Sequence, residues 1–427
     1  TRRSSDLCSK VGNGVLGAVY EMYADDAEGK LYVGGRFSLP DGSGNENIAY
    51  VTESGGTYTW HQMGTGINGE VRAITQYHGA IYAAGQFSVG GTPANVAVWN
   101  GTTWAAAGCV DGTVYDLAVA GDELYAAGEF GACDGSIGRN LARWNGTNWM
   151  IMAGMTGGKI NTIEPSGSGL IVGGVFAVDT ALNVARWTPE NGYTPLAGSL
   201  YNEVMDFEYF RGTLYAACRR TDAVDVYSLI MKLNEDGWHD GMVDPSFISR
   251  FEPLNGNLSF NTLCGTTSGL DVGGQYSFWH IMGVRGRACY NLFIPESWTM
   301  VDSIVNKMVR FKGRLILGGA FRTGVGVLSG GLNNIAQVGA TTAVTDVNRH
   351  EETITLHPNP ARTGTQVTTT AQWNGAHYRV ADATGRTVAE GNVTQATIDV
   401  PNVPAGLYIV TMITTAGQRQ TTKLLIQ

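Results

Sequence analysis

Histidine is the side chain most often used for acid–base chemistry and metal binding near neutral pH, and the chain contains seven of them. Three follow residue 340, and four fall at unrelated points before it: His61, His78, His239 and His280. They match no zinc spacing, Ser-His-Asp order or phosphate-binding loop, and no copper-type grouping of His with Tyr is recognisable. The sequence therefore predicts no catalytic residues, no enzyme activity and no cofactor.

One short segment, DGSGNEN, alternates oxygen-bearing side chains at Asp41, Ser43, Asn45 and Asn47. Such alternation is typical of a calcium-binding loop. The segment lacks the bidentate glutamate that completes an EF-hand loop at its twelfth position. We therefore expect a polar connection here, with weak calcium binding as the alternative, and no other metal site.

Six cysteines lie in the first 290 residues, and none forms a CxxC pair. An even number is compatible with disulfides in an exported protein, and buried free thiols are the alternative. Cys109 and Cys133 fall in adjacent connections on the same face of the repeat described next. We predict a disulfide between them, subject to the geometry that such a bond requires.

A glycine-bearing phrase, LYVGGRF at Leu31–Phe37, recurs along the chain at intervals of 43–56 residues. Repeats of this length are typical of propeller blades. The further copies, one of them degenerate at Cys218, are IYAAGQF (Ile81–Phe87), LYAAGEF (Leu124–Phe130), LIVGGVF (Leu170–Phe176), LYAACRR (Leu214–Arg220), LDVGGQY (Leu270–Tyr276) and LILGGAF (Leu315–Phe321).

Each copy has the same order of four strand-like segments. An alternating run such as Gly69–Tyr77 precedes the glycine phrase, a segment such as Asn95–Trp99 follows it, and Asn-Gly turns the chain into a fourth segment. The last copy lacks a fourth segment, and Leu7–Val19 aligns with a fourth segment leading into a first. We therefore predict an all-β fold: a seven-bladed β-propeller over residues 1–340, closed by the N-terminal strand. The glycines are expected to permit close backbone approach near the axis, and the phenylalanines to pack between blades.

The tryptophans recur with the repeat, which indicates packing in outer strands rather than a sugar-stacking platform. The members of this series are Trp99, Trp104, Trp144, Trp149 and Trp187. Trp238 and Trp279 break the phase, and the longest insertion, Trp238–Gly256, lies beside them. Because departures from a repeat concentrate on ligand-binding loops, we expect the binding surface within Arg219–Arg287.

Over residues 7–340 the pattern resembles the kelch and galactose-oxidase-like propellers, which pair Gly-Gly with a tryptophan about twenty residues later. The resemblance supports the fold. It implies no particular ligand, because fold and function are separable.

Composition changes after Gly339. Residues 341–353 read as a linker, and residues 354–427 contain short alternating segments that predict a small Ig-like β-sandwich. This segment resembles the type A C-terminal sorting domain of proteins exported by the type IX secretion system of Bacteroidota. The residues that match its motifs are Pro358, Asn359, Pro360, Asp382, Gly385, Gly406, Tyr408 and Lys423.

The resemblance implies export across the outer membrane, with the type IX translocon and its shuttle and attachment components as partners. Thr180 and Ser303 lie in Asp-Ser/Thr-aliphatic triplets that resemble the O-glycosylation motif of the same bacteria. The first residue, Thr1, fits a mature form from which a signal peptide has been removed.

The net charge of −9 argues against nucleic acid and anionic membrane as partners, and no apolar run approaches the roughly 20 residues of a membrane span. We expect a secreted cell-surface protein with a non-enzymatic role in binding or surface assembly. Self-assembly and a glycan or protein ligand are both compatible with the sequence. An adhesin or glycan-binding module is the first alternative, and an extracellular glycan-active enzyme is the second.

Overall fold

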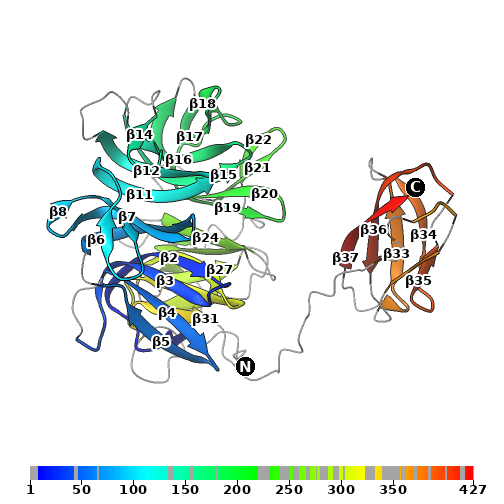
Figure 1. Ribbon diagram of the computed structural model, residues 1–427, viewed down its shortest axis with the longest axis horizontal. Helices are drawn as coiled ribbons and strands as arrows, with labels where there is room; N and C mark the ends of the chain where they lie inside the picture. Colours follow the sequence, from blue (N-terminus) through cyan, green and yellow to red (C-terminus); the bar gives the residue numbers. More distant parts are fainter. Residues whose placement is uncertain are drawn as a thin grey trace. The chain divides into compact units, whose positions relative to one another are not determined.

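The contacts within the computed structural model divide the chain into an N-terminal unit, Thr1–Ala340, and a C-terminal unit, Thr341–Gln427. Every element that the structure describes is a β-strand, which confirms the all-β prediction (Figure 1). The described residues are 8–42, 47–64, 67–132, 139–152, 157–178, 181–219, 230–240, 251–252, 259–265, 270–275, 277–278, 287–291, 298–301, 303–322, 332–338, 356, 359, 361–364, 366–369, 373–382, 386–399, 402–413 and 419–426.

The N-terminal unit begins with four antiparallel sheets of the same connectivity, in which consecutive strands are neighbours. The first contains β2 (Leu16–Asp25), β3 (Lys30–Ser38), β4 (Ile48–Ser54) and β5 (Thr57–Gln62). The second contains β6 (Ile67–Tyr77), β7 (Ala80–Val89), β9 (Val96–Trp99) and β10 (Trp104–Ala106), with β8 (Thr92–Pro93) paired to β7. The third contains β11 (Val110–Ala120), β12 (Glu123–Ala132), β13 (Leu141–Trp144) and β14 (Trp149–Ile151), and the fourth contains β15 (Lys159–Ser166), β16 (Gly169–Val178), β17 (Ala181–Thr188) and β18 (Gly192–Pro195).

Two further sets of four strands are joined into one sheet through a single pairing, Arg219 with Ser259. The first set is β19 (Glu203–Phe210), β20 (Thr213–Arg219), β21 (Ile230–Asn234) and β22 (Gly237–Asp240). The second is β24 (Ser259–Gly265), β25 (Leu270–Gln275), β27 (Arg287–Asn291) and β28 (Trp298–Val301), and the short strands β23 (Phe251–Glu252) and β26 (Ser277–Phe278) pair with each other.

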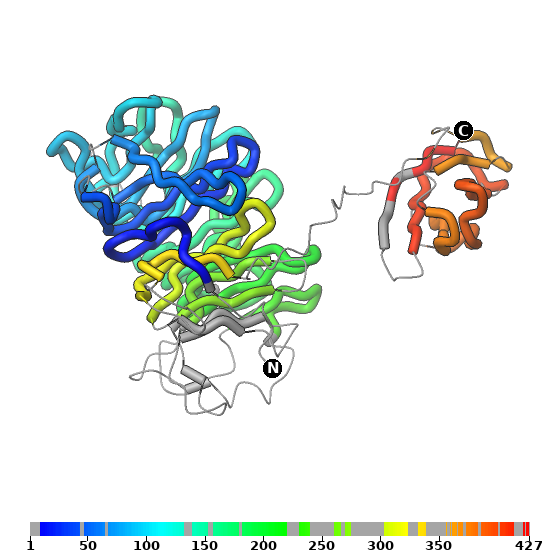
Figure 2. The backbone as a smooth tube through the Cα atoms, turned by 90° about the horizontal axis from the view of Figure 1, so that it is seen from below, coloured from blue at the N-terminus to red at the C-terminus, as the bar shows by residue number. Residues whose placement is uncertain are grey.

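The last sheet of the N-terminal unit is built from both ends of that unit. It contains β29 (Val305–Phe311), β30 (Arg314–Gly319) and β31 (Ile335–Val338), and β1 (Cys8–Lys10) pairs antiparallel to β31. Figure 2 shows the yellow strands of this sheet beside the blue strands of the first one. The unit is therefore propeller-like, with each set of four strands built around one copy of the sequence repeat.

Each first strand carries an irregularity at the same place. The register shifts by one residue in all seven first strands, for example between Val19 and Glu21 in β2 and between Val305 and Lys307 in β29. Such a bulge leaves one extra residue, Tyr20 in β2, and bends the strand. The shift re-aims the residues that follow it.

The bulge explains the glycine pair of the second strand. A Cβ on Gly35 would lie 2.1 Å from the Ala18 carbonyl oxygen, next to the bulge of its own sheet. A Cβ on Gly34 would lie 2.6 Å from Val71 Cγ1 of the next sheet. Close approach is thus required, as predicted, but to the bulged first strand and the neighbouring sheet. The phenylalanine that follows is buried, as at Phe37.

An asparagine just before the third strand ties each of several sheets to the next. Asn140 has a φ of 73°, its Oδ1 accepts from Phe130 N at 3.2 Å, and its Nδ2 donates to Gly158 O at 2.9 Å. Asparagine tolerates this left-handed conformation because its short side chain bonds locally. Asn47, Asn95, Asn183 and Asn334 also have positive φ and donate to a carbonyl oxygen at or just before the next first strand, although Asn183 lies within its third strand, β17.

Tryptophans of the fourth strands make the matching contact to the preceding sheet. Trp104 Nε1 donates to Met63 O and Trp149 Nε1 to Ala107 O, both at 2.7 Å. Both side chains are buried, which confirms the packing prediction for this series. Trp238 Nε1 donates to Leu196 O at 3.0 Å in the same way, so the prediction that Trp238 breaks the phase is wrong. Trp279 lies outside the described residues.

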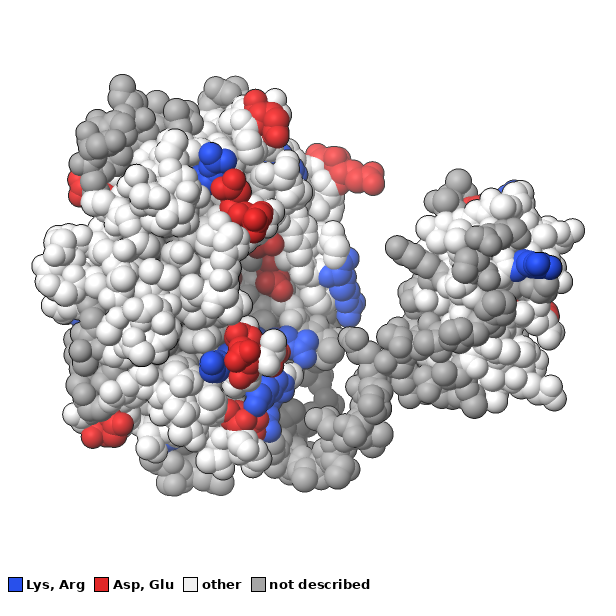
Figure 3. Space-filling model, in the orientation of Figure 1, with Lys and Arg blue, Asp and Glu red and all other residues white. Residues whose placement is uncertain are grey.

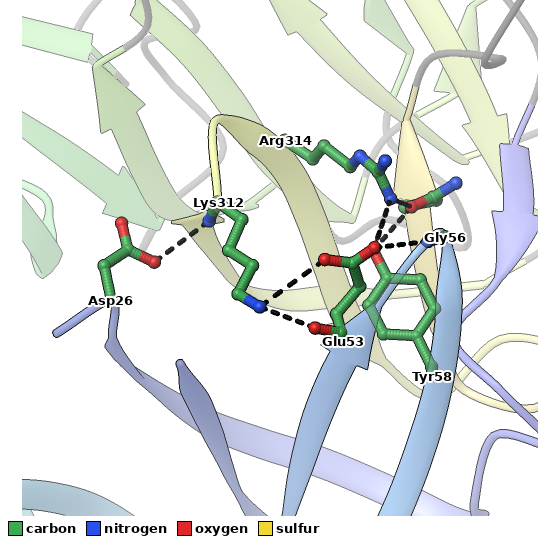
Figure 4. A network of polar contacts seen from close by, with 7 residues as sticks. Asp26, Glu53, Gly56, Tyr58, Lys312 and Arg314 are labelled. Carbon is green, nitrogen blue, oxygen red and sulfur yellow. Dashed lines mark hydrogen bonds and ion pairs between the residues drawn. The ribbon is translucent and has the colours of Figure 1, made fainter. Parts of the chain in front are cut away.

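A polar network joins the first and last sheets of the N-terminal unit (Figure 4). Lys312, in the turn after β29, donates from its backbone N to Asp26 Oδ1 at 2.9 Å and from Nζ to Glu53 O at 2.6 Å. Tyr58 OH donates to Gln337 Oε1 at 2.6 Å. These bonds therefore hold together two sheets that lie about 280 residues apart in sequence.

The C-terminal unit has two sheets over one core. One pairs β32 (Gln366–Thr368) with β35 (Thr397–Asp399), and the other has the order β34 (Thr387–Asn392), β33 (His377–Ala381), β36 (Gly406–Ile413) and β37 (Arg419–Ile426). The fully buried Trp373 lies in the core beside residues such as Val380 and Val410. Two sheets packed on a shared apolar core form a small β-sandwich.

Candidate functional site: the central cavity of the N-terminal unit

Every one of the seven first strands contributes to a cavity of about 320 Å³. Its lining is mainly polar, and it joins a second cavity of about 540 Å³ through shared residues such as Glu21, Asp116 and Lys307. Figure 3 shows a hollow in one face of the unit with acidic side chains inside it. The bulges contribute to this lining, because the extra residue of every first strand lines the cavity and the residue after it does so in five of the seven.

In five of the seven first strands the residue after the bulge lines both cavities, and these five residues form the level that the cavities share. Three of these residues are carboxylates, Glu21, Asp116 and Asp206, and we call them the acid ring. Lys307, at the equivalent position of β29, lies with Nζ 3.2 Å from Glu21 Oε2. It also interacts electrostatically with Asp206 and Asp116. The ring therefore places one cation among three carboxylates.

Backbone donors of the next sheet hold the acid ring in place. Asp116 Oδ2 accepts from Ile163 N at 2.8 Å, and Asp206 Oδ2 accepts from Leu263 N at 2.8 Å. Each bond crosses from one sheet to the following one. The acid ring thus contributes to the join between sheets as well as to the lining of the cavity.

Burial shifts the protonation of this cluster. It raises the pKa of Glu21 to about 7 and that of Asp116 to about 6, and it also raises the pKa of Asp206. Burial acts to lower the pKa of Lys307, but the carboxylates of Glu21, Asp206 and Asp116 outweigh it and raise that pKa. The lysine therefore stays charged at neutral pH, while Glu21 and Asp116 titrate near it.

Cations gather above the acid ring, at the level of the bulge residues. Arg72, Lys159 and Arg219 line the smaller cavity, and we call them the basic mouth. Arg72 lies with its guanidinium carbon 4.9 Å from the ring centre of Tyr20 and 5.6 Å from that of Tyr115. These cation–π contacts fix the guanidinium in position.

The larger cavity, beyond the acid ring, has a different character. Glu164 and Glu208 line it together with Cys264 and Arg310. Burial raises the pKa of Glu164 to about 7 and also raises the pKa of Glu208. The two cavities thus differ in charge: the smaller one adds three cations to the shared level, whereas the larger one adds two carboxyls and the cation Arg310.

Of the four histidines that precede residue 340, the three that the structure describes do not line this cavity, and His280 lies outside the described residues. His61 bonds Thr52 Oγ1 at 2.9 Å, His78 pairs with Asp122 at 2.7 Å, and His239 pairs with the nearby Asp236. Among the described residues no group of three or more His, Cys, Asp or Glu is arranged to hold a metal ion. The expectation of a non-enzymatic protein without a cofactor stays a prediction.

Only part of the calcium segment is described. Ser43 and Asn45 lie outside the described residues, and Asp41 lies in an exposed turn. Asn47 is 1% exposed, and its Oδ1 accepts from Phe37 N, so it serves the join between sheets described above. Calcium binding by this segment stays a prediction.

The structure describes only some of the residues in the cysteine and glycosylation predictions. Cys133 lies outside the described residues, so the Cys109–Cys133 pairing stays a prediction. Cys218 and Cys264 are free and buried, as in the alternative interpretation. Thr180 is not among the described residues, whereas Ser303 lies in the bend before β29.

The sorting-motif residues that are described have structural contacts in the sandwich. Asn359 Oδ1 accepts from Leu425 N at 2.9 Å, and Asp382 Oδ1 accepts from Arg386 N at 3.1 Å across a hairpin. Tyr408 OH donates to Pro404 O at 2.9 Å. Gly406 is the first residue of β36. Lys423 pairs with Ile409 in the sheet, and Pro358, Pro360 and Gly385 lie outside the described residues.

Sequence reasoning missed the acid ring and most of the basic mouth. Of these residues only Arg219 falls within the expected binding region Arg219–Arg287, which also supplies Asn261 to the lining of the cavity. The signal was present: an alignment of the first strands places Glu21, Asp116, Asp206 and Lys307 at one repeat position. A charged residue there, in a run otherwise apolar, indicates a shared polar axis.

Residues 355–427 match the family described as the secretion system C-terminal sorting domain. The chain is accordingly exported by type IX secretion to the cell surface, and its tail engages that secretion machinery. No helix among the described residues has the length and apolarity to cross a membrane. A search of curated proteins found no match.

Several solved structures resemble the whole chain weakly. PorZ, a surface component of the type IX secretion system of Porphyromonas gingivalis, is 12% identical, with a TM-score of 0.36 over 96% of this chain and 66% of that one. The extracellular domain of BT4673 from B. thetaiotaomicron is 12% identical, with a TM-score of 0.46 over 96% and 56%. The GH74 enzyme of Niastella koreensis is 10% identical, with a TM-score of 0.45 over 97% and 73%. The chain thus spans 66% and 56% of the first two, and likenesses this weak carry no argument about its activity.

Proposed function

We propose that this exported protein is a non-enzymatic binding protein of the cell surface, and that it takes a polar ligand into its central cavity. One observation carries the proposal: all seven first strands direct polar or charged side chains into a single cavity. Charged groups are costly to withdraw from water. A concave site that gathers them together with titrating carboxyls is where a ligand is expected.

The proposal includes a closed seven-bladed propeller as the scaffold. Each first strand contacts the next in the cycle β2, β6, β11, β15, β19, β24, β29 and back to β2. Asn306 Nδ2 donates to Val19 O at 2.8 Å across the last junction, as Asn161 Nδ2 does to Val204 O within the series. Trp60 Nε1 donates to Val11 O at 3.0 Å, which supports the N-terminal segment as the closing piece.

A glycan is the ligand class that fits an exported surface protein with hydroxyl, amide and aromatic groups around its cavity. The test is a glycan array probed with the full chain and with the cavity-narrowing variant Met205→Trp. Met205 lines the cavity, whereas Met150 is 46% exposed on β14, so Met150→Trp is the matched control.

We expect binding by the wild type and by Met150→Trp, and loss of binding by Met205→Trp. Binding that survives in Met205→Trp would place the ligand elsewhere and contradict the proposal. Absence of binding across the array would favour the surface-assembly alternative, which electron microscopy of native surface material examines directly.

A glycan-active enzyme is the second candidate, and one observation favours it. Glu21 and Asp116 lie in one cavity with pKa values of about 7 and about 6, and a carboxyl protonated near neutral pH can act as a general acid. The test is incubation of the bound glycan with the wild type and with Glu21→Gln. Cleavage by the wild type that Glu21→Gln abolishes would establish the enzyme, and an unchanged glycan would leave the binding protein.

A further inference from the structure

We infer that the basic mouth binds an anionic group of the ligand, a carboxylate, phosphate or sulfate. The inference rests on the proposed function, since it names the chemistry of what enters the cavity. The residues that would recognise this group are Arg72, Lys159 and Arg219. Neither the sequence motifs nor the comparisons assign these residues to a site.

The first argument is the local balance of charge. Glu203 is shared between two cations, with Lys159 Nζ at 2.7 Å from Oε1 and Arg219 at 3.5 Å from Oε2. Glu70 is shared in the same way between Arg72 at 2.5 Å and Arg36 at 3.7 Å. The three cations of the basic mouth therefore face two carboxylates, which leaves an excess of one positive charge in a chain of net charge −9. Arg36 has a side chain that is 73% exposed, and it does not line the cavity.

The second argument is that the cations are held in place before any ligand arrives. The Arg72 guanidinium lies between the rings of Tyr20 and Tyr115, and Lys159 Nζ lies 5.8 Å from the ring centre of Tyr115. A guanidinium has five N–H donors and an ammonium has three, so one carboxylate does not use all the donors of two such groups. Donors that are already oriented lose little conformational entropy on binding.

The third argument is the direction of the field along the cavity. The acid ring lies below the basic mouth and carries three carboxyls against the single cation of Lys307. An anion is attracted at the mouth and repelled from the deeper level. The anionic group is therefore retained at the mouth, and the neutral part of the ligand faces the polar lining beyond it.

The experiment is titration calorimetry of the full chain with D-glucuronate, D-glucose and inorganic phosphate. Glucuronate and glucose differ in one carboxylate, and phosphate tests the anion without a sugar. The variants are Arg219→Gln, which removes a cation of the mouth, and Glu203→Gln, which removes its carboxylate. Arg143→Gln is the matched control, because Arg143 pairs with Glu123 at 3.4 Å and does not line either cavity.

We expect glucuronate to bind at least about tenfold more tightly than glucose, the ratio given by one charge-assisted hydrogen bond. Arg219→Gln should weaken glucuronate binding by about tenfold, Glu203→Gln should tighten it, and Arg143→Gln should leave it unchanged. The opposite signs of the two mouth variants exclude a general loss of folding as the cause. Added salt should weaken the binding.

Equal affinity for glucuronate and glucose would overturn the inference and leave the proposed function standing. So would glucuronate binding that Arg219→Gln and Glu203→Gln do not change. Phosphate binding without glucuronate binding would support the anion site and identify phosphate rather than carboxylate as its ligand. If none of the three binds while the array shows a cavity ligand, the inference alone fails.

Discussion

Replacing Lys307 by methionine should destabilise the N-terminal unit in a pH-dependent way. The change keeps an unbranched side chain of similar length and removes the one cation that faces Glu21, Asp116 and Asp206. Breaking a buried ion pair costs about 3–5 kcal/mol, because a charge is left without a partner. The Lys307 side chain keeps 27% exposure to the cavity, so water compensates part of the loss, and we expect about 2–3 kcal/mol at about pH 8.

The loss should shrink as the pH falls. In the folded wild type the pKa of Glu21 is about 7, raised by burial from 4.5, and without Lys307 it should rise further. A carboxyl with a raised pKa opposes folding above that pKa, and the penalty disappears as the pH falls toward the unfolded value. At about pH 5 Glu21 and Asp116 are largely protonated and need no cation, so the variant should lose less than about 1 kcal/mol relative to the wild type.

The assay is urea unfolding followed by tryptophan fluorescence at about pH 8 and about pH 5. Nine of the ten tryptophans lie before residue 340, so the signal reports on the N-terminal unit. Lys30→Met is the control, since Lys30 lies in a surface pair 3.6 Å from Glu28 and should show a small loss at both pH values. A Lys307→Met loss of equal size at both pH values, or no loss at about pH 8, would refute the electrostatic account of the ring.

Three further predictions concern the joins of the fold. Asn140→Ala should lower the free energy of unfolding of the N-terminal unit by about 2 kcal/mol, because two hydrogen bonds are lost and alanine is strained at positive φ. Asn148 is exposed, so Asn148→Ala should have little effect in the same urea-unfolding assay. Tyr408→Phe should cost the C-terminal unit about 1 kcal/mol through its bond to Pro404 O, measured by calorimetry, and an unchanged transition would contradict the contact. Peptide mapping without reductant should recover Cys109 linked to Cys133, and alkylation of both thiols without reduction would contradict the pairing.

The repeat made the architecture of the N-terminal unit accessible from sequence. A phrase such as LYVGGRF records a local constraint, the contact of Gly35 with the Ala18 carbonyl, and that constraint recurs in each sheet. The pairing of β1 with β31 also followed from the repeat, because the last copy lacked a strand that the first residues could supply. A local structural constraint that recurs in every repeat can therefore be recognised from a single sequence.

The candidate site was not accessible in the same way. Its members, such as Glu21 and Lys307, lie up to 286 residues apart, and each looks like an ordinary polar residue within its own strand. Their proximity comes from the bulges, which the alternation of apolar residues does not reveal. The prediction for Trp238 failed for a different reason. Its third-strand partner is Leu233, whereas Trp104 and Trp149 pair with Trp99 and Trp144, so the tryptophan pair that marks the other copies is missing.

The most direct test of the central claim is a crystal structure of the full chain with the glycan selected by the array. The account predicts the ligand on the axis of a closed ring of seven sheets, with an anionic group at Arg72, Lys159 and Arg219. A ligand bound on the outer strands, with the central cavity filled only by water, would contradict it.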